Sequence, residues 1–395
     1  MTSSIAGQDL TTPPGESFDQ ENDLMHTRHY GLATATPPST ATQRHSHTFM
    51  SRVIEARESE YERERGMLFL DAIHESCGID RRYSVIEDFT RSDPEEFTFF
   101  PKNWRLDPFP TTAQRMALFE PMSITLAEEA ARGALGDARI PTEAVTHLIV
   151  TTCTGLYAPG PDILLVKRLG LRPTTRRTVI GFMGCYGAFN GLRMADQILG
   201  AEPDAVVLQV CVELCSLHYQ VKLEPHAIIG NCLFGDGCAA AVYARPGRFE
   251  GGYRDVVTTH CEITHDSLDQ MQWHIGDHGF DMILDVEVPR TLLAGGAAFV
   301  SDLLRLAGRD KKDIDAWVIH PGGPRIVDAV RDAAELSEAQ VSLSRSVLRD
   351  YGNMSSATTL FVLERQLKKS PHGGDLVMLG FGPGLTMEGA VLAGI

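Results

Sequence analysis

The feature that most constrains the fold is a series of short apolar segments that alternate with helical patterns from about residue 147 onward. H-L-I-V-T-T-C, R-T-V-I-G-F and A-V-V-L-Q-V-C-V are mainly apolar and lack the regular polar alternation of a half-exposed strand. Helical patterns separate them, and the first of these ends at Gly170. Strands that are apolar on both sides must be covered on both faces of their sheet. The sequence therefore predicts an α/β fold.

The same rhythm recurs in the second part of the chain. V-P-R-T-L-L-A-G-G predicts a long amphipathic helix, A-W-V-I-H a strand, and D-L-V-M-L-G-F and A-V-L-A-G two closing strands. Because 395 residues are too many for one simple core, we predict two similar α/β halves, at 27–245 and 246–395. Residues 1–26, rich in Ser, Thr and Pro, predict a disordered tail, and residues 50–76 a charged, solvent-facing helical region.

Charge and cysteine usage narrow the environment and the partners. The formal net charge is −16, which argues against general binding to nucleic acid or to an anionic membrane. No segment approaches the roughly 18 consecutive apolar residues of a membrane helix, and the N-terminus lacks the pattern of a signal peptide. The eight cysteines include no C-x-x-C pair, and several lie in apolar segments. These features predict a protein of the reducing cytoplasm.

One cysteine is placed for chemistry. Cys185, in I-G-F-M-G-C-Y-G, follows a strand pattern and opens a helix pattern. Backbone N–H groups at a helix N-terminus favour an anion, so we expect this location to lower the pKa of the thiol. The alternative is a buried structural cysteine, which the segment by itself does not exclude.

Two later segments carry groups that could serve this thiol. His320 ends the strand A-W-V-I-H and is followed by P-G-G-P, at the strand end where α/β proteins place ligand-binding groups. Asn353 lies in G-N-M-S-S-A. The alternatives are a core histidine bonded to a carbonyl and an asparagine that caps a helix. G-F-G-P-G at 380–384 lacks the helix of a dinucleotide site and is instead expected to support a cavity wall or a thioester.

A cysteine, a histidine and an asparagine fit two classes of enzyme. A papain-like hydrolase has its cysteine near the mature N-terminus, whereas Cys185 lies in the middle of the chain within an α/β rhythm. A carbon–carbon condensing acyltransferase needs a nucleophile and two hydrogen-bond donors for a thioester carbonyl, which a neutral histidine and an asparagine amide supply. We therefore favour the condensing enzyme.

Five motifs extend this interpretation. In order, they are G-C-Y-G-A around Cys185, L-F-G-D-G at 233–237, H-P-G-G-P at 320–324, G-N-M-S-S at 352–356 and G-F-G-P-G-L-T at 380–386. From about residue 28 onward, the chain resembles the type III polyketide synthases, the chalcone and stilbene synthase superfamily. The sequences of its motifs are more similar to those of bacterial members than to those of plant members. The resemblance implies a thiolase-like fold, with two similar halves in a layered α-β-α-β-α sandwich, and a homodimer.

The resemblance also implies roles for individual residues. Cys185 would carry the acyl-CoA starter and the growing chain, while His320 and Asn353 would bind malonyl-CoA, promote its decarboxylation and stabilise the enolate. Cyclisation would then yield a pyrone or a phenolic ring. Phe234 would be the aromatic gate between the CoA tunnel and the cavity. Neither a metal nor a redox cofactor is implied.

The resemblance places further residues around the cavity: Cys153, Cys215, His218, Trp273, Met282 and Ser355. Three of these, Cys153, Cys215 and His218, stand where plant members commonly have threonine. Trp273 stands where plant members have glycine, so its indole would occupy space that a large starter needs. We therefore expect a small or slim acyl chain.

The CoA entrance departs from the plant pattern, since Asp71 and Glu75 stand where basic residues are common. Arg82 and Arg325 could supply charge for the diphosphate, or both could be ordinary surface arginines. Delivery of the starter by an acyl carrier protein is the alternative to CoA. A ketoacyl-ACP synthase III-like enzyme, which condenses once and stops, is the alternative within the fold.

Overall fold

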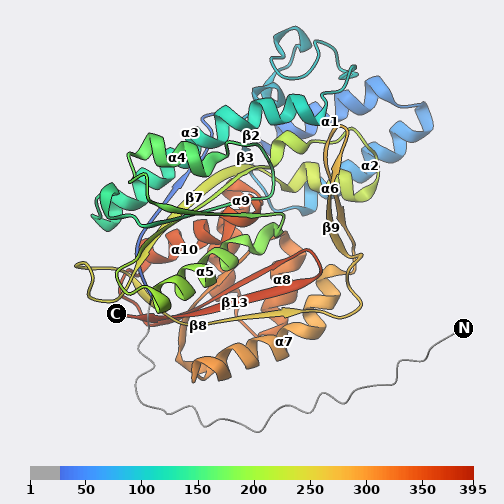
Figure 1. Ribbon diagram of the computed structural model, residues 1–395. Coiled ribbons are helices and arrows are strands. Elements are labelled where there is room, and N and C mark those ends of the chain that lie inside the picture. The colour runs from blue at the N-terminus through green and yellow to red at the C-terminus, as the bar shows by residue number, and fades with distance from the viewer. Residues whose placement is uncertain (1–26) are drawn as a thin grey trace, which may run out of the picture.

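The computed structural model describes residues 27–395, and a mixed β-sheet runs through its centre (Figure 1). The strands of this sheet are β1 (Arg28–Ala35), β4 (His147–Thr152), β5 (Arg176–Gly181), β6 (Val206–Leu214), β7 (Asp236–Ala244), β8 (Arg254–Ile263), β11 (Ile314–Ile319), β12 (Asp375–Gly382) and β13 (Thr386–Gly394). Two short pairs lie apart from it: β2 (Thr40–Thr42) with β3 (Arg81–Tyr83), and β9 (Met271–Gly276) with β10 (Gly279–Leu284). Residues 1–26, predicted to be a disordered tail, lie outside the described residues.

Ten helices in residues 27–395 pack around the sheet. They are α1 (Gln43–Arg57), α2 (Glu60–Ser76), α3 (Thr112–Ala138), α4 (Pro161–Leu169), α5 (Gly187–Ala201), α6 (Pro225–Leu233), α7 (Val288–Ala307), α8 (Pro324–Ala333), α9 (Glu338–Tyr351) and α10 (Thr358–Lys369). Gly170 ends α4 in the left-handed conformation, as its position in the sequence predicted. The charged region at 50–76 falls into two helices, because Ser59 interrupts it and caps α2 through its side-chain oxygen.

The two parts of the sheet repeat one topology. In the first part, β4 pairs parallel to β6, which pairs antiparallel to β7, which pairs antiparallel to β1. In the second part, β11, β12, β13 and β8 follow the same parallel, antiparallel, antiparallel sequence of pairings. The parts meet where β1 pairs with β8 over two residue pairs, Arg28 with Asp255 and His29 with Arg254. The prediction of two similar α/β halves is confirmed by this repeated order.

The layers follow from the apolar strands. Val206 and Leu208 of β6 face a core cluster shared with α3 and α4, whereas Val207 faces a second cluster shared with α5 and α10. In β11, Val318 joins that second cluster and Ile319 joins a third, shared with α7 and α8. Both faces of β6 and β11 are therefore buried, which explains why these strands lack polar alternation. The expectation of full cover is wrong for β5, the predicted R-T-V-I-G-F strand, because it lies at the edge of the sheet and is largely exposed. Figure 1 shows the resulting α-β-α-β-α order, with α5 and α10 between the two parts of the sheet.

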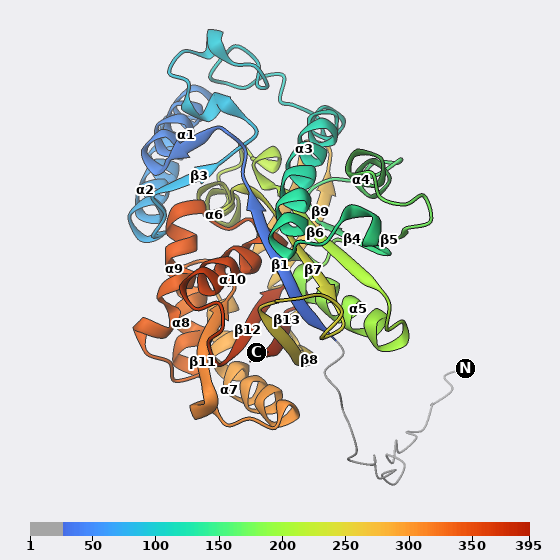
Figure 2. The same ribbon diagram turned by 90° about the vertical axis from the view of Figure 1, so that its left-hand side faces the viewer.

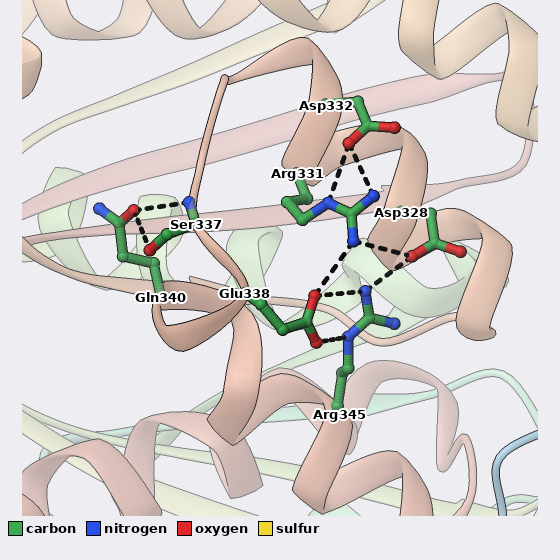
Figure 3. Close-up of polar contacts among 7 residues, drawn as sticks. All are labelled: Asp328, Arg331, Asp332, Ser337, Glu338, Gln340 and Arg345. Carbon is green, nitrogen blue, oxygen red and sulfur yellow. Dashed lines mark hydrogen bonds and ion pairs between the residues drawn. The ribbon is translucent and has the colours of Figure 1, made fainter.

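Ion pairs join α8 and α9 at the surface (Figure 3). Arg331 of α8 pairs with Glu338 of α9 at 3.0 Å, and Arg345 of α9 pairs with Asp328 of α8 at 2.6 Å and with Glu338. Single exposed pairs contribute about 0–1 kcal/mol, but this network links several charges. It ties together the helix that follows His320 and the helix that precedes Asn353.

The remaining elements gather at one end of the molecule. Figure 2 shows α1 and α2 there together with β3 and α6, beside α9. A small core cluster of Cys77, Ile79, Leu233 and Leu348 joins these elements. In residues 27–395, no helix combines the length and apolar composition that spanning a bilayer requires.

Candidate active site

Cys185 lies in a single 3₁₀ turn, Gly184–Tyr186, between β5 and α5. The backbone before it is strained at Phe182, which has φ 57°, whereas Gly184 has φ 76°, a value that glycine adopts without strain. A Cβ on Gly184 would lie 2.3 Å from Cδ of Pro383, so only glycine lets the nucleophile loop meet the 380–384 loop. As the sequence predicted, that glycine-rich loop supports a cavity wall: Phe381 and Pro383 line the cavity in front of Cys185.

Asn353 adjoins the thiol and also serves the chain that follows it. Its amide nitrogen Nδ2 lies 3.8 Å from Sγ of Cys185, and its Oδ1 lies 3.9 Å from the same sulfur. Oδ1 accepts from the backbone N–H of Ser355 at 2.9 Å, which is a capping contact, and Nδ2 donates to the carbonyl of Gly322 at 3.3 Å. Because capping engages only the oxygen, it leaves Nδ2 as a hydrogen-bond donor near the thiol, so the predicted catalytic role and the capping role are compatible.

His320 follows β11 and is almost completely buried, at 1% exposure. Its backbone N–H donates to the carbonyl of Leu379 at 2.8 Å. Neither ring nitrogen, Nδ1 or Nε2, has a hydrogen-bond partner among the described residues. Burial lowers the pKa of this imidazole to about 3, so the ring is neutral at physiological pH and holds one donor and one acceptor. The alternative of a core histidine bonded to a carbonyl is therefore wrong.

The thiol has a high pKa in this setting. Burial raises the pKa of Cys185 to about 12, while hydrogen bonds from Asn353 and Ser355 act in the opposite direction. The expectation that the helix N-terminus lowers the thiol pKa is wrong for the resting site, because desolvation outweighs it. Burial opposes charge on Cys185 and on His320 alike, so the resting pair is neutral. A thiolate and an imidazolium formed together by proton transfer would offset each other's charge.

One cavity brings the predicted residues together. It is lined by the candidate catalytic residues Cys185, His320 and Asn353 and by the predicted pocket residues Cys153, Cys215, Phe234, Trp273, Met282 and Ser355. The volume of this cavity that is accessible to water is about 70 Å³. A second, smaller space of about 60 Å³ lies alongside. Cys215, Phe234, Trp273 and Met282 line both spaces and so form a partition between them.

His218 belongs to the wall and lines only the second space, although the sequence placed it at the substrate pocket. Its Nε2 lies 2.7 Å from the carbonyl of Thr154, and its Nδ1 accepts from the N–H of Phe280 at 2.9 Å. Its ring stacks on Phe280 and meets Trp273 edge to face. With both nitrogens engaged, His218 stiffens the partition and has no free group for a substrate.

The two arginines of the predicted CoA entrance differ. Arg82 is buried, and its guanidinium donates to the carbonyl of Phe234 at 2.8 Å, to the carbonyl of Asn231 and to Oγ of Ser46 at 2.6 Å. It is therefore neither of the alternatives that the sequence left open, a free diphosphate ligand or a surface arginine. Arg325 is exposed in the first turn of α8, five residues beyond His320.

Sequence reasoning missed Glu213, a fully buried carboxyl at the end of β6. It accepts from the backbone N–H of Cys153 at 2.9 Å, from Oγ1 of Thr154 at 2.8 Å and from Oγ of Ser356 at 2.5 Å. Burial raises its pKa, although these hydrogen bonds oppose the shift. A charged residue inside the apolar segment V-L-Q-V-C-V-E-L-C was the available signal. Glu213 ties together the segments on either side of the cavity.

Among residues 27–395, no cluster of three His, Cys, Asp or Glu is placed to hold a metal ion.

Comparisons with known proteins agree on one family. The models of chalcone and stilbene synthases match here, the N-terminal domain over residues 30–246 and the C-terminal domain over residues 255–395. The alpha-pyrone synthesis polyketide synthase-like Pks18 of Mycobacterium tuberculosis is 31% identical over 365 residues, which cover 91% of this chain and 89% of that protein. The protein of the same name from Mycobacterium bovis gives the same values.

Two crystal structures share the fold. PKS-I of the brown alga Ectocarpus siliculosus has a TM-score of 0.87 and 29% identity, covering 95% of this chain and 100% of that one. The C-terminal type III polyketide synthase domain of Steely1, a type I/III hybrid from Dictyostelium, has a TM-score of 0.84 and 25% identity, covering 93% of this chain and 99% of that one. The chain therefore belongs to the chalcone and stilbene synthase family, and it is a type III polyketide synthase, a condensing acyltransferase with a thiolase-like fold.

Proposed function

We propose that this enzyme takes an acyl group from an acyl-CoA onto Cys185 and extends it with malonyl-CoA by decarboxylative Claisen condensation. The observation that carries the proposal concerns the two buried ring nitrogens of His320, which have no hydrogen-bond partner among residues 27–395. His320 lines the cavity of Cys185 together with Asn353. Buried polar atoms without partners are costly, by about 1–3 kcal/mol each, unless a ligand completes them. A thioester carbonyl, which accepts two hydrogen bonds, fits these donors.

Each step assigns a task to one residue. Cys185 transfers its proton to His320, and the thiolate attacks the thioester carbon of the starter, so that the CoA thiolate leaves with the proton. Malonyl-CoA then binds with its thioester oxygen between the His320 N–H and Nδ2 of Asn353. Its carbon–carboxylate bond breaks, CO₂ leaves, and the electron pair becomes an enolate held by the two donors. The enolate carbon attacks the acyl group on Cys185, forms the new carbon–carbon bond and releases the thiolate.

Charge on the entrance side supports CoA thioesters as substrates. Arg325 is exposed next to the H-P-G-G-P turn and is available to a diphosphate. Phe234 stands in the partition between the two spaces and fits the role of an aromatic gate. The chemistry of the proposed steps uses only side chains of the protein and the two thioesters. An acyl carrier protein remains the alternative donor of the starter.

The size of the cavity supports a short or slim acyl chain. About 70 Å³ is open to water centres in front of Cys185, where one water needs roughly 10–15 Å³ of such space. Trp273 closes the far side, and its indole N–H donates to the carbonyl of Cys153 at 2.7 Å. For ring closure we favour a pyrone over a phenolic ring, because the similar mycobacterial protein is described as an alpha-pyrone synthesis enzyme.

Assembly and compartment complete the proposal. We place the junction of the two halves near residue 245, between β7 and β8. The edge strand β5 exposes Val179, and Met183 beyond it is also exposed, which supports contact with a second copy in a homodimer. All eight cysteines are free thiols, which fits a reducing cytoplasm.

The test is incubation of purified protein with malonyl-CoA and a panel of acyl-CoAs, followed by mass spectrometry and measurement of CO₂. We expect cyclised polyketides from the wild type and none from Cys185→Ala, with Cys261→Ala as the control because that thiol is exposed on β8. Full product formation by Cys185→Ala would contradict the nucleophile. A single 3-ketoacyl thioester on carrier protein would support the synthase III-like alternative, and peptide or ester cleavage alone would support the hydrolase.

A further inference from the structure

Arg82 contacts several segments near the candidate site, and we call this set of contacts the Arg82 bracket. It is the central residue of β3, with 7% of its surface exposed, and its hydrogen-bond partners are uncharged. Nη1 donates to the carbonyls of Asn231 and Phe234, which lie at the C-terminal end of α6, and Nη2 donates to Oγ of Ser46 on α1. The guanidinium reaches these acceptors from two nitrogens held in a rigid plane, a geometry that the single nitrogen of an ammonium group cannot reproduce.

The stem of Arg82 packs against two glycines. A Cβ on Gly352 would lie 2.8 Å from Cγ and 2.9 Å from Cδ of Arg82, and a Cβ on Gly235 would lie 3.2 Å from the Cβ of Arg82. Gly352 also has φ 72°, in the left-handed region. Gly235 immediately follows Phe234 in the chain, and Gly352 immediately precedes Asn353. The stem therefore rests on both segments that carry the gate and the donor amide.

The two segments are themselves bonded to each other. The N–H of Asn353 donates to the carbonyl of Leu233 at 2.9 Å, and the N–H of Gly235 donates to the carbonyl of Asn353 at 3.0 Å. Phe234 and Asn353 form an isolated parallel bridge. Arg82 lines the second space and not the cavity of Cys185, whereas Phe234 and Asn353 both line that cavity. A shift of this bracket would move both of them at once.

We propose that Arg82 is a positioning residue, which holds the backbone at Phe234 and Asn353 so that the Asn353 amide meets the malonyl thioester. This inference rests on the proposed function of Asn353. A contact with the CoA diphosphate would need the guanidinium to leave the Phe234 and Asn231 carbonyls and to become exposed. Arg82 thus acts on the geometry of decarboxylation, and Arg325 is left as the arginine available to CoA.

The test compares two thioesters that differ in the diphosphate. Malonyl-CoA and the malonyl thioester of N-acetylcysteamine share the reacting group, but only the first carries phosphate. For Arg82→Met we expect the kcat of decarboxylation to fall about 10- to 100-fold on both, with a small change in KM, because a misplacement of about 1 Å costs up to 100-fold. Arg82→Lys should not restore kcat, since the charge remains but the fork is lost.

Two variants serve as references. Arg325→Met should raise the KM for malonyl-CoA and leave the KM for the short thioester unchanged. Arg290→Met, on an exposed arginine of α7, should match the wild type on both substrates. If Arg82 were a phosphate ligand, Arg82→Met would behave like Arg325→Met and Arg82→Lys would recover activity. That result would overturn the proposal.

Folding failure is controlled by a milder change. Ser46→Ala removes one partner of the guanidinium and leaves the charge in place, and we expect a kcat loss of several-fold on both thioesters. An unchanged kcat in folded Ser46→Ala, together with an unfolded Arg82→Met, would refute the bracket. The rate of Cys185 alkylation by iodoacetamide is a readout that needs no substrate, because Nδ2 of Asn353 lies 3.8 Å from Sγ. If the wild type decarboxylates neither thioester, the proposed function fails, and a changed alkylation rate in the Arg82 variants would still support the bracket.

Discussion

Removal of the Trp273 indole should lengthen the products of the enzyme. The ring stands in the partition between the two spaces, held by the hydrogen bond from Nε1 to the carbonyl of Cys153 at 2.7 Å. It also meets the rings of His218 and Phe280 edge to face, at centroid distances of 5.5 and 5.8 Å. Trp273→Ala takes away the partition, whereas Trp273→Phe keeps a ring there and loses only the N–H.

The spaces on either side of the indole set the size of the effect. Their water-accessible volumes are about 70 and about 60 Å³. Joining them therefore about doubles the volume available in front of Cys185, and the volume of the removed indole adds to this gain. At roughly 10–15 Å³ per water, the gain exceeds the need of one further two-carbon unit. Loss of the ring should also lower the free energy of unfolding by about 3 kcal/mol, near the lower end for large aromatic residues. Trp273→Phe should cost about 1 kcal/mol through the lost hydrogen bond.

The assay is product analysis by mass spectrometry with malonyl-CoA and acyl-CoAs of two, six and twelve carbons. We expect Trp273→Ala to accept longer starters or to add at least one more malonyl unit, and Trp273→Phe to give the wild-type products. Thermal unfolding verifies that both variants are folded. A folded Trp273→Ala protein that makes the wild-type set of products would refute the idea that the indole limits chain length.

Two further variants probe the nucleophile loop. Gly184→Ala should lower the free energy of unfolding by about 1–3 kcal/mol more than Gly170→Ala in chemical denaturation: both have positive φ, but only at Gly184 would the Cβ meet Pro383, at 2.3 Å. Equal losses would contradict the tight contact. His320→Gln should slow alkylation of Cys185 by iodoacetamide at pH 6–7 and displace the pH profile upward, because burial raises the thiol pKa and the imidazole is the neighbouring group that can take its proton. An unchanged profile would mean that the thiol does not depend on His320.

Much of the fold could be predicted because it depends on local pattern. The strands H-L-I-V-T-T-C and A-V-V-L-Q-V-C-V were identified from their apolar runs, and Gly170 from its place after a helical pattern. The hairpin of β9 and β10 was not predicted, because its residues are mixed in polarity and half exposed. Its position depends on the rings of His218 and Phe182 that it packs against, and these come from other parts of the chain.

The candidate site divides in the same way. Residue chemistry and order along the chain were enough to select Cys185, His320 and Asn353, since a nucleophile, a neutral imidazole and an amide at strand and helix ends suit few reactions. Sequence could not say that Arg82 faces the carbonyls at the end of α6, because that depends on how β3 and α6 meet. The presence of Glu213 in an apolar segment was a signal of its burial. The partners that satisfy its carboxyl could not be predicted, because they come from distant segments.

From the sequence alone, apolar periodicity predicted strands covered on both faces of a sheet, and five ordered motifs predicted the family and, through that resemblance, the layered architecture. Residue type and position predicted the three candidate catalytic groups. The tertiary structure decided that the Cys185 thiol and the His320 imidazole are neutral, that His218 packs against Trp273, and that Arg82 bonds to carbonyls at the end of α6. Desolvation and hydrogen bonding sum over atoms from segments far apart in the chain. The neighbours of a residue in the sequence therefore do not predict its desolvation or its hydrogen bonds, nor the pKa that results from them.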